Sequence, residues 1–165
     1  MRFLALACDY DGTLADEGRL AAPTRAALAA VRASGRKLLV VTGRERPDLE
    51  RVAAGLDLFD LVVAENGAVL YWPGTGAERL LAPAPPPAFV AALRRAGVTP
   101  LGVGRCIVAT VHPHEHTVRE IIRQLGLELA VVFNKGAVMV LPAGVDKATG
   151  LAAALAELGL SPAGV

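Results

Sequence analysis

Two aspartates, Asp9 and Asp11, stand two positions apart after the apolar run Leu4–Cys8, and a glycine follows them. A short apolar segment that ends in a turn signal is typical of a buried parallel strand, and reactive groups in open α/β sheets lie beyond the carboxyl ends of such strands. Gly12 allows a turn tight enough for both carboxylates to face one pocket. Because neighbouring carboxylates repel each other, we expect a cation between them, and Mg²⁺ prefers such oxygen ligands. One carboxylate could then attack phosphorus while the other transfers protons.

A second polar group, made of Thr42, Gly43 and Arg44, follows the apolar segment Lys37–Val41. It offers a hydroxyl, an approachable backbone amide and a guanidinium beside a helix start, which together suit the binding of a phosphate. Lys147 opens a later helix, at the end where the helix dipole favours anions over cations. It is therefore either a solvent-facing lysine or a point charge between a phosphate and the attacking carboxylate.

The elements that position these residues alternate between strand and helix in the first half of the chain. Apolar runs predict three strands, and helical periodicity after prolines predicts two helices between them. The strands cover Phe3–Cys8, Lys37–Val41 and Leu61–Ala64, and the helices run from Pro23 to Gly35 and from Pro47 to Ala54. Right-handed crossovers then predict an α/β fold with a parallel sheet covered on both faces. Asp9, Thr42 and the segment Glu65–Gly67 would meet at one edge of that sheet.

The composition changes at the proline-rich stretch 82–87, which is typical of a stiff connector and a domain boundary. Beyond it we expect helices at Phe89–Ala96 and Glu115–Leu125 and strands at Cys106–Val111, Leu129–Phe133 and Ala137–Leu141. Such a pattern is typical of a small α+β module. A helix at Lys147–Leu158 then resumes the first pattern. We therefore predict a discontinuous core of residues 1–82 and 143–165, with residues 83–142 as an insertion.

The bulk composition limits the kinds of partner. The 165 residues carry a formal net charge of +1, which does not suggest a nucleic-acid-binding surface, and no apolar run approaches the length of a membrane span. Cys8 and Cys106 show no metal-ligand or redox spacing, so we expect reduced thiols and a cytoplasmic protein. The expected partner is a small molecule, without nucleic acid or membrane. The sequence does not determine the oligomeric state, and a homodimer is one of the states that it allows.

Four segments resemble the motifs of one family in chain order. Asp-Tyr-Asp-Gly-Thr-Leu at 9–14 resembles motif one of the haloacid dehalogenase-like (HAD) hydrolases, D-x-D-G-T after an apolar strand. Val-Thr-Gly-Arg at 41–44 resembles motif two, and the segment 144–150 around Lys147 resembles motif three. Glu-Asn-Gly-Ala at 65–68 is similar to the corresponding segment of subgroup IIB, which contains Cof-like and sucrose-phosphatase-like proteins. The resemblance implies a Rossmannoid core with a C2-type cap at residues 83–142, which closes over the site and selects the substrate.

The resemblance also implies a role for each matched residue. Asp9 would be the nucleophile that forms an aspartyl-phosphate and a ligand of Mg²⁺, and Asp11 the general acid/base that also binds the metal. Lys147 would complete the catalytic set by stabilising the phosphate. Thr42 and Gly43 would bind the phosphate, and Arg44 and Asn66 would line the entrance and face the substrate.

One family feature has no counterpart in the sequence. Family members carry an acidic G-D-x-x-N-D-like segment after a fourth strand, and this sequence ends where that strand would begin. We therefore expect a C-terminally truncated core that holds Mg²⁺ weakly. The leading hypothesis is a Mg²⁺-dependent phosphomonoester hydrolase (a HAD phosphatase) that acts on a small phosphorylated metabolite. The alternative is a catalytically impaired phosphate-binding or interaction module. A phosphoacceptor receiver domain is disfavoured by the insertion and by the paired aspartates.

All three histidines lie close together, at His112, His114 and His116. Alternating histidines could bind a transition metal, but Pro113 and the helix that follows place them in a strand-to-helix turn. We expect them to be polar surface residues of the insertion.

Overall fold

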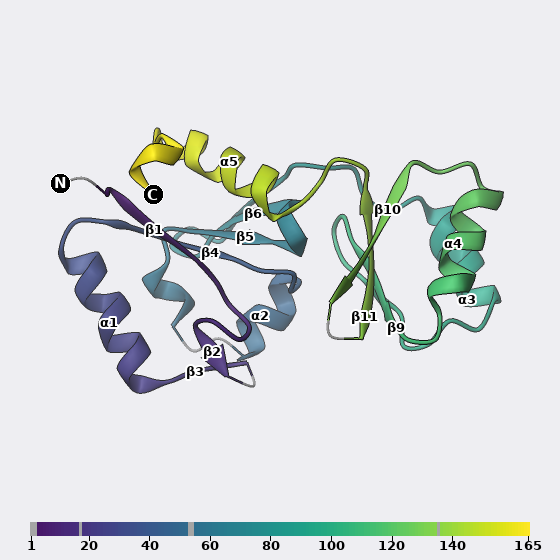
Figure 1. Cartoon of the computed structure of the whole chain (residues 1–165), viewed down its shortest axis with the longest axis horizontal. Coiled ribbons are helices and arrows are strands. Elements are labelled where there is room, and N and C mark those ends of the chain that lie inside the picture. Colours follow the sequence, from purple (N-terminus) through teal and green to yellow (C-terminus); the bar gives the residue numbers. More distant parts are fainter. Residues whose placement is uncertain (1–2, 17, 53–54, 135) are drawn as a thin grey trace. The chain divides into compact units, whose positions relative to one another are not determined.

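The computed structural model describes residues 3–16, 18–52, 55–134 and 136–165 (Figure 1). The chain divides into two compact units. The first contains the residues up to Leu81 together with Asp146–Val165, and the second contains Ala82–Val145. The chain thus leaves the first unit once and returns to it, as an inserted module requires.

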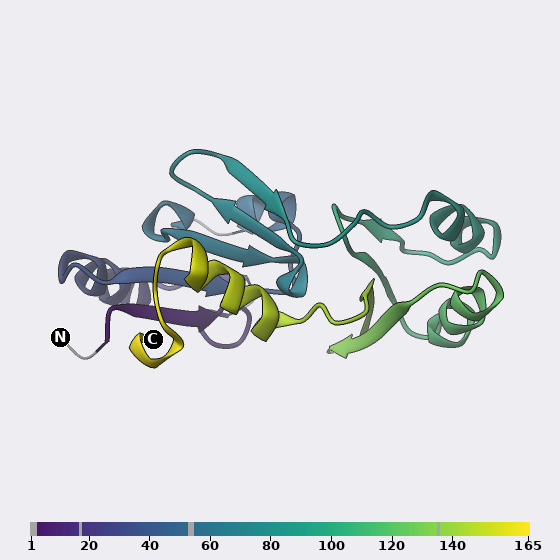
Figure 2. The same ribbon diagram turned by 90° about the horizontal axis from the view of Figure 1, so that it is seen from above.

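The first unit is built on a five-stranded sheet in the order β1-β4-β5-β6-β7. Strands β1 (Ala5–Asp9), β4 (Lys37–Val41) and β5 (Leu61–Ala64) are parallel, as the sequence predicts. Strands β6 (Val69–Trp72) and β7 (Ala77–Leu80) extend the sheet as an antiparallel hairpin, visible in Figure 2. The prediction of a parallel sheet therefore holds for the first three strands, and the whole sheet is mixed.

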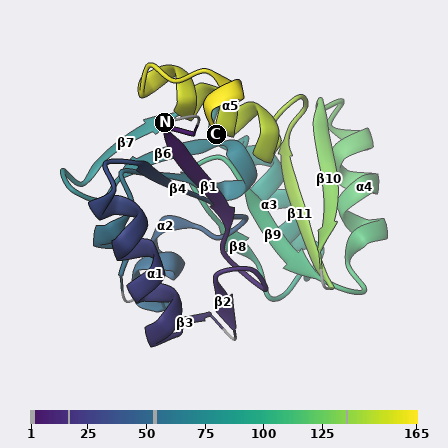
Figure 3. The same ribbon diagram turned by 60° about the vertical axis from the view of Figure 1, so that its left-hand side comes forward.

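Helices cover both faces of this sheet (Figures 1 and 3). Helix α1 (Ala22–Ala33) and helix α2 (Arg46–Val52) lie on one face, and α5 (Lys147–Glu157) lies on the other. Ala154 and Leu155 of α5 pack in one apolar cluster with alternate residues of the strands, among them Leu39, Leu61 and Val63. The predicted end of the second helix, Ala54, lies outside the described residues. Short 3₁₀ turns occur at Leu56–Leu58, Glu65–Gly67 and Pro162–Gly164.

The first strand differs from its prediction. It was expected to be buried, but it is an edge strand among the described strands and pairs only with β4. Its residues Leu6, Ala7 and Cys8 are half-buried, and Phe3 and Leu4, which precede it, are 47% and 48% exposed. An edge position explains the difference because only one neighbouring strand shields the apolar side chains. The small hairpin of β2 (Ala15–Asp16) and β3 (Arg19–Leu20), which follows β1, was not predicted.

The second unit has an antiparallel sheet in the order β10-β11-β9-β8. Its elements are α3 (Pro87–Arg95), β8 (Gly102–Val103), β9 (Val108–Val111), α4 (Glu115–Gln124), β10 (Leu129–Asn134) and β11 (Ala137–Pro142). The two helices lie side by side on one face of the sheet (Figure 2). Phe89 and Leu93 of α3 and Val118 of α4 pack there against Val108 and Val138. The predicted strand at Cys106 begins two residues later, and β8 was not predicted.

The Asp60 carboxylate ties the start of β4 to the loop before β5. Its two oxygens accept hydrogen bonds from the backbone N–H of Leu38 and from Nζ of Lys37, each at 2.9 Å. Burial opposes ionisation of this carboxyl, but the bond from Leu38 and then the ammonium of Lys37 outweigh it and lower the pKa of Asp60. The ionised form is therefore the one that stabilises the fold.

We predict that Asp60→Ala lowers the free energy of unfolding by about 1–3 kcal/mol, since it leaves the fully buried N–H of Leu38 without its acceptor. Because the folded-state pKa is depressed, this stabilisation is present above the unfolded pKa of about 3.9 and is lost as the pH falls through the folded value. Urea unfolding of both proteins at several pH values measures the difference, which should shrink below about pH 4. The control is Asp57→Ala in the same loop, where the carboxylate is exposed. A pH-independent difference would contradict the prediction.

Candidate active site

The candidate site lies at the carboxyl ends of the parallel strands of the first unit. Asp9 is the last residue of β1 and pairs in register with Val41, the last residue of β4. Val41 in turn pairs with Val63 of β5. The segments that follow, beginning at Thr42 and Glu65, therefore leave the sheet at the same edge as Asp9. The convergence predicted from three separate strand ends is a consequence of this register.

Lys147 and Asp9 are brought into contact although 138 positions separate them. Nζ of Lys147 donates a hydrogen bond of 2.6 Å to Oδ1 of Asp9, and both side chains are partly exposed. Lys147 is the first residue of α5, and Asp146 is its N-cap in a capping box with Thr149. The backbone N–H of Thr149 donates to Asp146 Oδ1 at 2.7 Å. The sequence left two roles open for Lys147, and the structure places it against the proposed nucleophile.

Asp11 is paired with Arg44. Nε and Nη2 of Arg44 donate to the two oxygens of Asp11, each at 2.8 Å. Nη1 of the same guanidinium donates to Asp48 Oδ2 at 2.5 Å. The hydrogen bonds to Asp11 and then to Asp48 raise the pKa of Arg44 despite its partial burial. Arg44, which was predicted to face the substrate, is thus held between two carboxylates in this structure.

Thr42 and Asn66 lie deeper than the charged residues. Thr42 is buried, and its Oγ1 accepts a hydrogen bond of 3.1 Å from the backbone N–H of Arg44. Asn66 is 8% exposed, has a positive φ of 56°, and donates its backbone N–H to the carbonyl of Thr42 at 2.9 Å. Gly43 is partly buried between Thr42 and Arg44. These contacts join the segments after β4 and β5 into one backbone framework.

Two residues of the site were not singled out from the sequence. Tyr10 lies between the two aspartates, is 1% exposed, and donates its hydroxyl to the carbonyl of Gly18 at 2.9 Å. Tyr10 directly follows β1, and its hydrogen bond to Gly18 anchors the loop that carries Asp11. Asp48, in the first turn of α2, accepts the hydrogen bond from Nη1 of Arg44 and so orients the guanidinium. Nothing in the local sequence indicated the contact of Tyr10 with Gly18 or that of Asp48 with Arg44.

The donor chemistry of Asp9 and Asp11 fits Mg²⁺ in part. Carboxylate oxygens are suitable ligands, and Mg²⁺ is commonly held by one or two carboxylates together with substrate phosphates and water. Within the described ranges, no group of three or more histidine, cysteine, aspartate or glutamate side chains is arranged to hold a metal ion. Each of the two aspartates has instead a cationic partner, Lys147 or Arg44. Asp9 and Asp11 would hold the ion once the side chains of Lys147 and Arg44 turn toward an anionic ligand.

Two of the histidines of the second unit have protein partners. His112 Nδ1 lies 2.9 Å from Glu115 Oε2, and His114 Nε2 lies 2.9 Å from the carbonyl oxygen of Thr99. The structure thus engages them in separate local contacts around the start of α4. They remain predicted surface residues of this unit.

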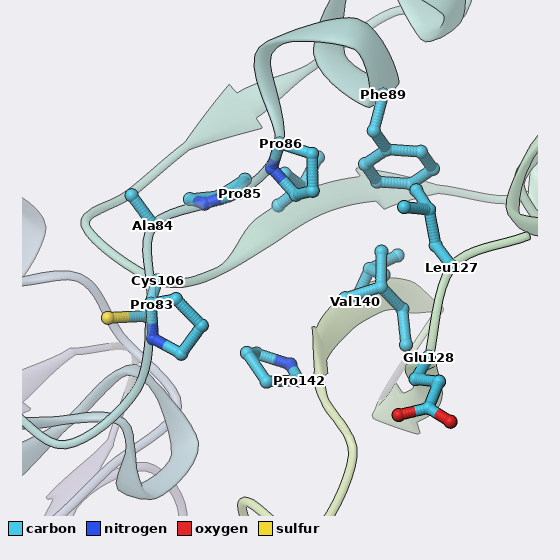
Figure 4. A pocket seen from close by; sticks show the side chains of 12 residues that line it. Pro83, Ala84, Pro85, Pro86, Phe89, Cys106, Leu127, Glu128, Val140 and Pro142 are labelled. Atoms are coloured by element: carbon cyan, nitrogen blue, oxygen red, sulfur yellow. The ribbon is translucent and has the colours of Figure 1, made fainter. Parts of the chain in front are cut away.

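The second unit also contains an apolar pocket of about 220 Å³ (Figure 4). Its walls come from the proline-rich connector, the start of α3 and the end of β11, with Phe89, Val140 and Pro142 among the lining residues. Glu128 is the one charged residue in its lining, and Sγ of Cys106 donates to the carbonyl of Ala82 at 3.0 Å. The pocket therefore has none of the paired charges that mark the edge of the first unit's sheet.

The fold and the site together define an α/β protein of the Rossmann type, with its charged residues at the carboxyl ends of parallel strands and an inserted module later in the chain. Residues 6–77, which contain all the proposed site residues except Lys147, match the family model of the haloacid dehalogenase-like hydrolases. This match supports the family resemblance inferred from the motifs. None of the helices in the described part is long and apolar enough to cross a membrane.

Solved structures similar to the chain carry the same fold. BT1666 from Bacteroides thetaiotaomicron, a phosphatase of the HAD superfamily, is 20% identical with a TM-score of 0.70, over 96% of this chain and 74% of that one. A haloacid dehalogenase-like hydrolase from Bacteroides thetaiotaomicron is 16% identical with a TM-score of 0.78, and the match covers 96% of this chain and 78% of that one. The subclass IIB sugar phosphatase BT4131 is 18% identical with a TM-score of 0.72, and the match covers 95% of this chain and 76% of that one. No curated protein sequence matches the chain.

Proposed function

We propose that this protein is a hydrolase that cleaves phosphomonoesters of small metabolites, with Asp9 as the nucleophile. The observation that carries the proposal is the 2.6 Å contact between Lys147 Nζ and Asp9 Oδ1 at the carboxyl end of β1. The ammonium of Lys147 offers a positive charge to an incoming phosphate beside the proposed nucleophile. The solved structures named as phosphatases support the same reaction class.

In the proposed first step an oxygen of Asp9 forms a bond to phosphorus, and the bond between phosphorus and the ester oxygen breaks. The phosphoryl group is then carried by Asp9, and the leaving alkoxide takes a proton from Asp11. In the second step Asp11 removes a proton from water, and the water oxygen forms a bond to phosphorus. The bond between phosphorus and the Asp9 oxygen breaks, which releases inorganic phosphate and restores the carboxylate of Asp9. Mg²⁺ bound by Asp9 and Asp11 would offset the negative charge of the phosphate.

Arg44 has a gating role in this proposal. Its two hydrogen bonds occupy both carboxylate oxygens of Asp11, whereas Asp11 needs an oxygen free to carry the proton that a general acid transfers. An incoming phosphate is a competing anion for the guanidinium, since arginine binds phosphate and carboxylate in the same bidentate way. We infer that Arg44 turns to the phosphate on substrate binding and thereby releases Asp11 for proton transfer.

The unit Ala82–Val145 is proposed to act as a C2-type cap that selects the substrate. Two observations support this: the chain enters and leaves it through single connections, and the solved structure of the subclass IIB sugar phosphatase matches 95% of the chain, a span that includes this unit. The substrate class is proposed to be a small phosphorylated metabolite in the cytoplasm. Sugar phosphates are the first group to assay.

A second candidate is a phosphate-binding module with little turnover. The pairing of both aspartates with cations favours it, because Lys147 and Arg44 compete with a metal ion for the same oxygens. In that case the site would bind inorganic phosphate or a phosphate ester without cleaving it.

Hydrolysis of p-nitrophenyl phosphate separates the two candidates. We expect release of p-nitrophenolate that rises by about tenfold or more on addition of MgCl₂ to protein treated with EDTA, since the metal offsets charge in the transition state. The control substrate is p-nitrophenyl acetate, which lacks phosphorus and should not respond. Phosphate binding by calorimetry without turnover would favour the binding module. Turnover that EDTA leaves unchanged would contradict the metal requirement.

A further inference from the structure

The turn Glu65–Gly67, between β5 and β6, has an unusual backbone. Glu65, Asn66 and Gly67 have positive φ values of 49°, 56° and 109°, and the first two are not glycines. Positive φ is unfavourable for residues with a Cβ, so such a conformation persists only where surrounding contacts impose it. All three residues are buried. The turn is therefore held by its neighbours rather than by its own preference.

One set of contacts joins the turn to the segment proposed to bind phosphate. The backbone N–H of Glu65 donates to the carbonyl of Arg44 at 3.0 Å, and that of Asn66 donates to the carbonyl of Thr42 at 2.9 Å. These bonds align the turn with the start of the loop after β4. Gly67 is left at the far side of the turn, where it meets helix α5.

The backbone of α5 lies directly on Gly67. A Cβ added to Gly67 would overlap the carbonyl oxygen of Asp146 and lie 2.5 Å from its carbonyl carbon. A Cβ added to Gly150, one turn further along α5, would lie 2.5 Å from Gly67 Cα and 2.7 Å from Gly67 O. Real Cβ atoms essentially never approach other atoms within 3.0 Å. Both glycines are therefore required for this approach.

The position of Lys147 depends on this approach. Lys147 follows Asp146, the residue that Gly67 touches, and Asp146 is fixed to Thr149 by the capping box. The amino end of a helix dipole disfavours a cation, so the helix itself does not stabilise the ammonium of Lys147 there. Its 2.6 Å contact with Asp9 then requires the first turn of α5 to be held in place by packing.

We propose that Gly67 and Gly150 are positioning residues that set Lys147 against Asp9 through the contact of the turn Glu65–Gly67 with α5. The catalytic consequence rests on the proposed function of Asp9 and Lys147. The placement of Lys147 does not rest on that function, because it concerns only the contact between the side chains of Lys147 and Asp9 in the free protein.

The test uses Gly150→Ala as the main variant and Gly67→Ala as the second. Alanine is favoured over glycine inside a helix, so Gly150→Ala would stabilise α5 if packing on Gly67 were unimportant. Gly35→Ala is the matched control for backbone strain, because Gly35 also has a positive φ, of 82°, with nothing within 4 Å of an added Cβ. Circular dichroism shows whether each variant is folded. If Gly67→Ala does not fold, the test is made with Gly150→Ala alone.

The first readout is kinetic. A displacement of about 1 Å can cost on the order of 100-fold in rate, so we expect Gly150→Ala to lower kcat by about that factor while KM changes by less than about threefold. If the glycine acts through Lys147, the double variant Gly150→Ala/Lys147→Met should be no slower than Lys147→Met alone. Additive losses would overturn the proposal, and so would an unchanged kcat in Gly150→Ala if Lys147→Met itself lowers kcat.

The second readout needs no activity. The lysines are reductively methylated with ¹³C, and the Lys147 signal is assigned by its absence in Lys147→Arg. Asp9→Asn should shift this signal in the wild-type background and leave it unchanged in the Gly150→Ala background. A shift of the same size in both backgrounds would overturn the positioning role. If the signal behaves as expected but kcat does not respond to Lys147→Met, the proposed function fails and the positioning role stands.

Discussion

Replacing Asp9 with asparagine is expected to lower kcat for p-nitrophenyl phosphate by about 10⁴-fold or more, as is usual when a catalytic nucleophile is removed. An amide oxygen is uncharged and a poor nucleophile toward phosphorus, yet asparagine has nearly the shape of aspartate. Lys147 can still donate to the amide oxygen that replaces Asp9 Oδ1, so the fold should be retained. The measurement is steady-state hydrolysis together with mass spectrometry of acid-quenched protein. Wild-type protein should gain the mass of one phosphoryl group, and Asp9→Asn should not.

Asp16→Asn is the matched control for this experiment. Asp16 is an exposed carboxylate in the hairpin that follows the site, and its substitution removes the same charge from the same region. We expect its kcat to stay within about twofold of wild type, because surface charges interact weakly through water. Phosphorylation of Asp9→Asn at the wild-type level would show that another residue is the nucleophile. A loss of activity in Asp16→Asn as large as in Asp9→Asn would show that net local charge, and not the nucleophile, is responsible.

Replacing Lys147 with methionine is expected to have the second largest effect, a loss of about 10²–10³-fold in kcat. Methionine keeps most of the length and apolar volume of lysine but removes the charge that lies 2.6 Å from Asp9 Oδ1. The phosphoryl group in transit would lose a nearby cation, and the carboxylate of Asp9 would lose its hydrogen-bond donor. Initial rates over a range of substrate concentrations separate kcat from KM. The loss should fall mainly on kcat if the charge acts in the transition state.

Two further variants serve as controls for Lys147→Met. Lys147→Arg keeps the positive charge in a planar group, and we expect it to recover only part of the rate because the guanidinium does not replace a compact ammonium. Lys37→Met removes a lysine that pairs with Asp60 away from the site, so it should affect stability but not kcat. Equal kcat values for Lys147→Met and wild type would contradict the role of Lys147. They would leave the assignment of Asp9 to be decided by its own substitution.

Much of the fold follows from local patterns in the sequence. The strands Lys37–Val41 and Leu61–Ala64 were predicted with the bounds that the structure has, because continuous apolar runs between turn residues allow little else. Helix α5 begins at Lys147 as predicted, where the sequence Asp146–Thr149 forms a capping box. These features depend on residues within a few positions of one another. A single sequence therefore contains the information that specifies them.

Other features depend on which distant segments meet, and the sequence pattern is silent about them. The apolar run before Asp9 predicts a strand but not whether one or two strands flank it, so its edge position was missed. Short pairs such as β2 with β3, and the weak strand β8, contain too few residues to produce a periodic signal. The antiparallel pairing of β6 with β5 was not predicted. That pairing depends on tertiary contacts beyond the turn.

The candidate site divides in the same way. The residue types at the strand ends, Asp9, Asp11 and Thr42, and the lysine at the start of α5 were determined by the sequence alone, because each follows directly from its own local element. Only the tertiary structure decided that Lys147 contacts Asp9 across 138 positions and that Arg44 holds Asp11. The physical reason is that side-chain pairing depends on strand register and helix packing. In this protein the packing is set by a strained turn and by two glycines that let α5 lie on it.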